Sequence, residues 1–123
     1  MQAALHVARE FGVPLTVSGG RCDPFARANR DGHLILDLRR MAAVSYNTAA
    51  NAVTVQGGTT TGDLLRALPE DLVTVTGKNA MVGVVSLTLG GGYGPLNGRF
   101  GLACDALQSA QVVLADGQVV DAS

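Results

Sequence analysis

The stretch GVVSLTLGGGYGPLNGRFGLACD, residues 83–105, decides the fold of this chain. It holds seven of the sixteen glycines, and these alternate with apolar residues instead of the serines and asparagines of a flexible linker. Because glycine lacks a Cβ atom, its backbone can adopt positive φ and can approach a ligand closely. The stretch therefore predicts a ligand-facing loop around residues 90–94, suited to a flat or an anionic ligand.

Two common nucleotide-binding fingerprints do not fit the glycines of this chain. A dinucleotide-binding GxGxxG would need a third glycine at position 95 or 97, where Pro95 and Asn97 stand. The phosphate loop GxxxxGK[ST] fits Gly77-Lys78 only in part, because Leu72 replaces its first glycine and Asn79 its hydroxyl residue. The loop is therefore neither a standard Rossmann turn nor a P-loop.

The composition indicates one packed domain, or part of one. The 123 residues are 47% hydrophobic but only 4% aromatic, so a core of Val, Leu and Ala is expected. The net charge is −1 and the basic residues are scattered, which gives no basic stripe for nucleic acid. The apolar runs are too short to span a membrane. We expect neither a nucleic-acid nor a membrane partner.

The two cysteines, Cys22 and Cys104, lie far apart without CxxC spacing. They predict free core thiols in a reducing compartment, with a disulfide or a reactive thiol as the alternative. Met1–Phe11 lacks the features of a signal peptide, so a cytoplasmic location is expected. With two histidines and no cysteine cluster, no metal site is expected.

Hydrophobic periodicity and turn residues predict an α+β domain with mixed small sheets, roughly seven short strands and one or two helices. Helices are expected over Gln2–Phe11, which Gly12 ends, and over Gly62–Leu68, which a threonine of Thr59–Thr61 caps. Strands are expected at Leu15–Ser18, His33–Leu38, Val44–Asn47, Asn51–Gln56 and Leu72–Val75, and in a hairpin of Ala106–Leu114 and Gln118–Asp121 that turns at Asp116-Gly117.

Seven short motifs occur in one order along the chain. They are VSGG at 17–20, LDL at 36–38 with Met41, VTVQGG at 53–58, Gly77 with VG at 82–83, GGGYG at 90–94, RFGLACD at 99–105 and VVLADG at 112–117. This order resembles the FAD-binding (PCMH-type) domain of the vanillyl-alcohol oxidase class, and most of all its berberine-bridge-enzyme-like branch. The resemblance covers nearly the whole chain.

The resemblance implies that residues 1–123 are a partial FAD-binding domain, incomplete at both ends. Members of the family begin with a strand before the first helix, continue past the last hairpin, and add a substrate domain that carries most catalytic side chains. The implied function is the FAD-binding part of an FAD-linked oxidoreductase, in which a hydride moves from a small-molecule substrate to flavin N5. The alternative is a non-catalytic flavin-binding module, or a remnant that needs a partner chain: the rest of the enzyme or a second copy.

The resemblance also implies cofactor contacts in three segments. The loop Ser18–Cys22 and the stretch Gly77–Gly83 would cradle the FAD pyrophosphate and ribityl chain through backbone N–H groups. Residues 84–94 would run beside the isoalloxazine ring. The implied cofactor-binding residues are Ser18, Gly19, Gly20, Arg21, Cys22, Gly77, Asn79, Val82, Gly83, Gly90, Gly91, Gly92, Tyr93 and Gly94.

Two positions depart from the pattern of the family. A histidine that tethers FAD often follows the first Gly-Gly, where this chain has Arg21. A tethering cysteine of some members falls at Asn79. FAD is therefore expected to be held non-covalently. Arg21 is expected either to pair with a phosphate oxygen or to be a solvated surface side chain.

The remaining candidates have ordinary structural interpretations. Tyr93 suggests a general base, but packing near the flavin or closing of the loop is the better interpretation inside GGGYG. Asp105 is expected to cap a turn rather than to contact the cofactor. Asp37 is expected to be a strand-end carboxylate, and Asp63 a charge in the first turn of a helix. The sequence singles out no catalytic residue.

Overall fold

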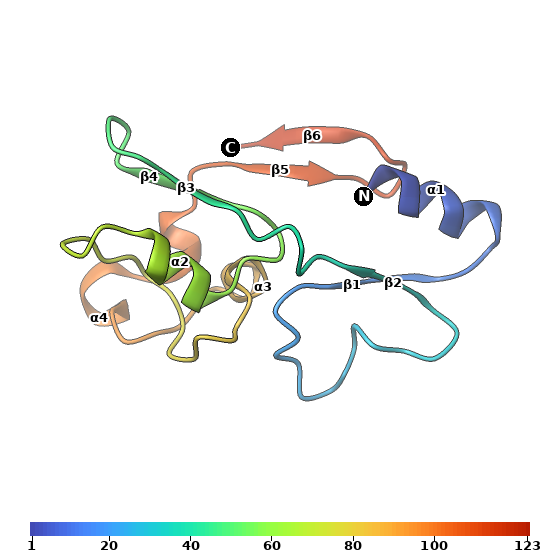
Figure 1. Cartoon of the computed structure of the whole chain (residues 1–123), viewed down its shortest axis with the longest axis horizontal. Helices are drawn as coiled ribbons and strands as arrows, with labels where there is room; N and C mark the ends of the chain where they lie inside the picture. Colours follow the sequence, from blue (N-terminus) through green and yellow to red (C-terminus); the bar gives the residue numbers. More distant parts are fainter.

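A computed structural model describes all 123 residues as short elements joined by long loops (Figure 1). The helical segments are α1 (Gln2–Glu10), α2 (Thr61–Ala67), α3 (Val84–Leu89), α4 (Asn97–Phe100) and the 3₁₀ turn η1 (Ala103–Ala106). The strands are β1 (Leu15–Ser18), β2 (Leu34–Asp37), β3 (Val44–Asn47), β4 (Ala52–Val55), β5 (Ala110–Val113) and β6 (Val119–Ala122).

The strands form three separate two-stranded sheets. β1 pairs with β2 in parallel, whereas β3–β4 and β5–β6 are antiparallel. Ser18 and Asp37 lie opposite each other at the last position of the parallel pair. Because both strands run in the same direction, the loops that leave their carboxyl ends start side by side.

Most of the predicted elements are confirmed, and their end signals act as expected. Gly12 follows α1 with φ +61°. Thr60 caps α2, since its hydroxyl accepts from the Asp63 N–H while the Asp63 carboxylate accepts from the Thr60 N–H. Gly117 turns the last hairpin with φ +90°.

One predicted strand is absent, and one helix was not predicted. Leu72–Val75 forms no strand, and the N–H groups of residues 73–76 donate no backbone hydrogen bond. The helix that was not predicted is α3, which directly precedes the expected loop at residues 90–94. Its β-branched residues favour strands, but the Val84 N–H is held by the Thr59 carbonyl, 2.9 Å away, where the helix starts. There are thus six strands and four α-helices, where roughly seven strands and one or two helices were expected.

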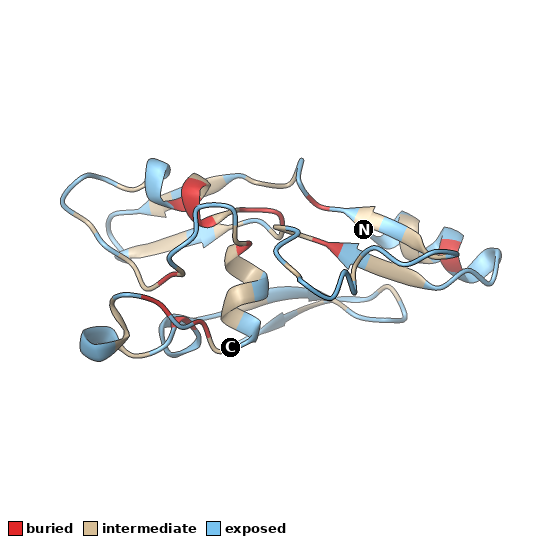
Figure 2. Cartoon of the chain, turned by 90° about the horizontal axis from the view of Figure 1, so that it is seen from below, coloured by how far each residue is buried: buried red, intermediate tan, exposed pale blue.

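The buried core consists largely of backbone and small side chains. Only 13 of the 123 residues are buried, in short patches spread over the chain (Figure 2). No valine is among them, so the expected core of Val, Leu and Ala is only partly realised. The buried residues are Ala8, Ser18, Leu38, Gly58, Thr59, Thr61, Gly62, Leu64, Thr76, Gly83, Gly92, Gly94 and Ala103.

Other expectations concern the cysteines and the membrane. Cys22 and Cys104 are free, as predicted, but both are exposed rather than in the core. None of the helices combines the length and the apolar character needed to cross a bilayer.

Replacing Gly58 by alanine tests the backbone packing. A Cβ atom at Gly58 would overlap the carbonyl oxygen of Leu38, so Gly58→Ala should lower the free energy of unfolding by about 1–3 kcal/mol. Gly98→Ala is the matched control, because Gly98 lies in α4 with open space around its Cβ position. The control should be neutral or stabilising by up to about 1 kcal/mol. Urea denaturation measures the free energy of unfolding of both variants. A Gly58→Ala variant with the urea midpoint of the wild type would contradict the close contact between Gly58 and the Leu38 carbonyl.

Candidate cofactor-binding site

The loop after β1 and the loop before α3 meet backbone to backbone. A Cβ atom at Gly20 would overlap the backbone nitrogen of Gly83, and one at Gly83 would lie 2.8 Å from the nitrogen of Gly20. Real Cβ atoms do not approach so closely, so each position requires glycine. The structure therefore brings together the Ser18–Cys22 loop and the Gly77–Gly83 stretch, which the family resemblance assigned to one site.

Both loops present rows of unpaired backbone donors. The N–H groups of the four residues from Gly19 to Cys22 donate to no acceptor in the protein, nor do those of the four residues from Gly77 to Ala80. All eight residues are partly or fully exposed. Successive free N–H groups in turn conformations form concavities that bind anions. The two rows therefore suit a phosphate-bearing ligand.

Ser18, the last residue of β1, adds an unusual hydroxyl to this region. The residue is fully buried, yet its Oγ atom has no hydrogen-bond partner in the protein. Buried hydroxyl groups are normally paired. An orphaned hydroxyl directly before the Gly19–Cys22 donors is a sign of a site built for a polar group.

Gly90–Gly94, the glycine-rich end of the third predicted segment (residues 84–94), packs against η1. The carbonyls of Gly91 and Gly92 accept from the N–H groups of Cys104 and Ala103, each at 3.0 Å. A Cβ atom at Gly92 would overlap Ala103, and one at Gly94 would overlap the Thr76 carbonyl. Internal packing thus explains glycine at positions 92 and 94, where the sequence suggested close approach of a ligand.

The other predicted residues occupy varied positions. The Tyr93 side chain projects from its loop and is 73% exposed. The side-chain oxygen of Asn79 accepts from the Met81 N–H at 2.9 Å. Val82 is half-buried, and its carbonyl accepts from the Thr61 N–H at 2.8 Å. Asp105 caps a turn, as expected, by accepting from the Leu102 N–H at 2.8 Å.

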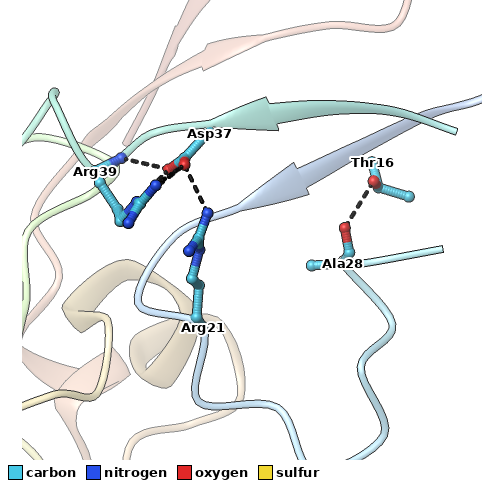
Figure 3. Close-up of polar contacts among 5 residues, drawn as sticks. All are labelled: Thr16, Arg21, Ala28, Asp37 and Arg39. Carbon is cyan, nitrogen blue, oxygen red and sulfur yellow. Dashed lines mark hydrogen bonds and ion pairs between the residues drawn. The ribbon is translucent and has the colours of Figure 1, made fainter.

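Arg21 takes part in an ionic cluster that sequence reasoning missed (Figure 3). Its Nη2 donates to Oδ2 of Asp37 at 2.7 Å, so the side chain is not simply solvated. Arg39 binds the same carboxylate through its backbone N–H at 3.0 Å and its Nη2 at 2.7 Å. Hydrogen bonds from Arg39, helped by the charge of Arg21, lower the pKa of Asp37 to about 2. The Arg39 contact is local in the sequence, whereas the Arg21 contact depends on the parallel pairing of β1 with β2.

The sequence and the fold of this chain are similar to those of known proteins. A family model described as FAD binding domain matches residues 1–123. A curated relative, (R)-6-hydroxynicotine oxidase of Paenarthrobacter nicotinovorans, is 36% identical over 118 residues, which are 95% of this chain and 26% of that enzyme. The chain thus spans about a quarter of the length of the curated relatives it matches.

Solved structures share the fold. The glucooligosaccharide oxidase of Acremonium strictum has a TM-score of 0.90 at 36% identity, over 99% of this chain and 26% of that one. Its FAD is described as 6-S-cysteinyl and 8α-N1-histidyl. A berberine-bridge-enzyme-like protein of Physcomitrella patens has a TM-score of 0.92 at 34% identity, over 98% of this chain and 27% of that one.

The acid titration of Asp37 gives a testable pH dependence. The pKa of Asp37 in the folded protein is about 2, below the usual value near 3.9 of an unfolded aspartate. Its ionic contacts therefore stabilise the fold above about pH 4, and this contribution is lost as the pH falls toward about 2. We expect Asp37→Asn to lower the melting temperature at pH 7, and we expect the difference from the wild type to shrink between about pH 4 and pH 2. A difference that stays constant over this range would contradict the assignment.

Proposed function

We propose that this chain, which belongs to the FAD binding domain family of FAD-linked oxidoreductases, binds FAD without a covalent link. The family resemblance and the α+β fold class predicted from the sequence are confirmed. One observation carries the proposal of binding: two rows of free N–H groups lie on loops that touch at Gly20 and Gly83.

The residues present fit such a cofactor. The donors at 19–22 and 77–80 would hold the pyrophosphate oxygens, and the missing side chain at Gly20 keeps the loops close enough to share one ligand. Residues 90–94 would line the ring. When bound, FAD supplies the flavin N5 that accepts a hydride from a small-molecule substrate. The protein contributes binding, orientation and electrostatics.

The side chains at the two tether positions support non-covalent binding. Neither Arg21 nor Asn79 can form the histidyl or cysteinyl link described for the glucooligosaccharide oxidase. Arg21 is bound to Asp37, and Asn79 caps its own loop. The cytoplasmic location expected from the sequence is part of this proposal.

Flavin retention tests this function. The chain should be purified with added FAD, desalted, examined by absorbance, and then precipitated with acid. We expect flavin bands with the native protein and a colourless pellet, because acid unfolds the protein and releases a ligand that is not covalently bound. Yellow colour in the pellet would refute non-covalent binding. A folded chain without flavin bands would refute binding itself.

A second candidate is a remnant that works only with a partner chain, and the surface of the molecule favours it. The accessible surface is 8348 Å², whereas a compact protein of this mass exposes roughly 6200 Å². Large apolar side chains account for part of the excess, including Leu89 at 80%, Phe25 at 77% and Met81 at 72% exposed. An excess of roughly 2000 Å² is comparable to the area that permanent interfaces bury.

Analytical ultracentrifugation over a range of concentrations tests this second candidate. We expect the purified chain to self-associate, because exposed apolar side chains gain free energy when they are covered. Leu89→Ser together with Met81→Ser should shift the distribution toward monomer. A wild-type chain that stays monomeric at all concentrations and unfolds cooperatively would exclude an obligate partner.

A further inference from the structure

The loop between β1 and β2 is tied back to the parallel strands by side chains at two places (Figure 3). Near its start, Arg21 binds Asp37 of β2 at 2.7 Å. Farther along, the Thr16 hydroxyl of β1 donates to the Ala28 carbonyl at 2.8 Å. Only the first tie lies next to the free N–H groups of Gly19–Cys22.

We propose that Asp37 is a positioning residue, which sets the Gly19–Cys22 donors for the cofactor by holding the side chain of Arg21. The inference rests on the proposed FAD binding. Asp37 itself touches no cofactor in this scheme. It acts through Arg21, whose own N–H is one of the four donors.

The backbone of Arg21 explains why such a tie is needed. Its φ is +58°, a left-handed conformation that a residue with a Cβ atom adopts only at a cost in free energy. This conformation turns the chain directly after Gly20, the residue that contacts Gly83. Without a tie, Arg21 would relax toward negative φ, and the row of N–H groups would change direction.

The charges favour a tie over a direct phosphate contact by Arg21. Asp37 is ionised throughout the physiological range, since Arg39 keeps the pKa of this carboxyl low. The Arg21 and Asp37 side chains are 42% and 31% exposed, so water screens their attraction only in part. A guanidinium that bound phosphate would have to leave this carboxylate.

The two schemes make opposite predictions for Asp37→Asn. If Asp37 positions the loop, loss of its charge should weaken FAD binding, and Arg21→Gln should weaken it to the same extent. If Arg21 binds phosphate directly, loss of Asp37 frees the guanidinium, and binding should stay equal or become tighter.

The chain offers two matched controls. Asp23 forms the same kind of ion pair with Arg27, at 3.0 Å, and has the same lowered pKa of about 2, but both partners lie within one turn of the loop. Asp23→Asn therefore removes an equal charge without cutting the tie to β2. Thr16→Val removes the other tie of the loop and leaves Arg21 in place.

FAD titration of the full chain, followed by flavin fluorescence, measures the effect. We expect Asp37→Asn and Arg21→Gln each to weaken binding about tenfold, and the double variant to be no weaker than either single variant, because both cut one interaction. Asp23→Asn and Thr16→Val should stay within about twofold of the wild type. Binding by Asp37→Asn that equals or exceeds the wild type would overturn the inference, as would additive losses in the double variant.

Trypsin cleavage without FAD gives an independent readout of the tie. Trypsin must take the arginine side chain into its pocket, so an Arg21 that is held by Asp37 should be cut slowly. Asp37→Asn should accelerate cleavage after Arg21 but not after Arg27, and Asp23→Asn should do the reverse. Cleavage after Arg66, which lies inside α2, monitors general unfolding. An unchanged rate at Arg21 would overturn the tie, whereas wild-type chain that is protected at Arg21 but binds no FAD would refute the proposed function alone.

Discussion

The contact between Gly20 and Gly83 is the constraint on which the candidate site depends. Two backbones that touch without side chains between them fix the spacing of the two loops that carry the free N–H groups. Close approach of main chains at Gly58, Gly92 and Gly94 takes the place of the usual packing of valine and leucine.

Hydroxyl groups and ion pairs complete this backbone framework. Thr61 and Thr76 are buried, and their hydroxyl oxygens lie 3.0 Å apart, which joins the start of α2 to the segment before Gly77. At the other loop, Asp37 joins the end of β2 to Arg21. The Ser18–Cys22 loop and the Gly77–Gly83 stretch are thus each held by polar side chains from a neighbouring element rather than by an apolar layer.

Much of this architecture could be predicted from the sequence, because local signals determined it. Gly12, Thr60 and Gly117 mark the ends of elements through their own backbone conformation or hydrogen bonds. The failures occurred where distant residues decide the structure. The Thr59 carbonyl anchors the start of α3, against the β preference of Val84 and Val85, and Asp37 meets Arg21 only because β1 and β2 pair in parallel. The FAD-contacting roles of individual residues stay predictions.

The two loops that form the site are far apart in the sequence, and this separation has a consequence for biosynthesis. Gly20 and Gly83 are more than sixty residues apart, and the Gln2 side chain binds the Gly117 carbonyl across 115 positions. Contacts of such long sequence separation form slowly, because a large loop must close before they can be made. A nascent chain therefore cannot assemble the two rows of donors until most of its residues have left the ribosome. A ligand that needs both rows can therefore bind only after the chain has emerged beyond Gly83.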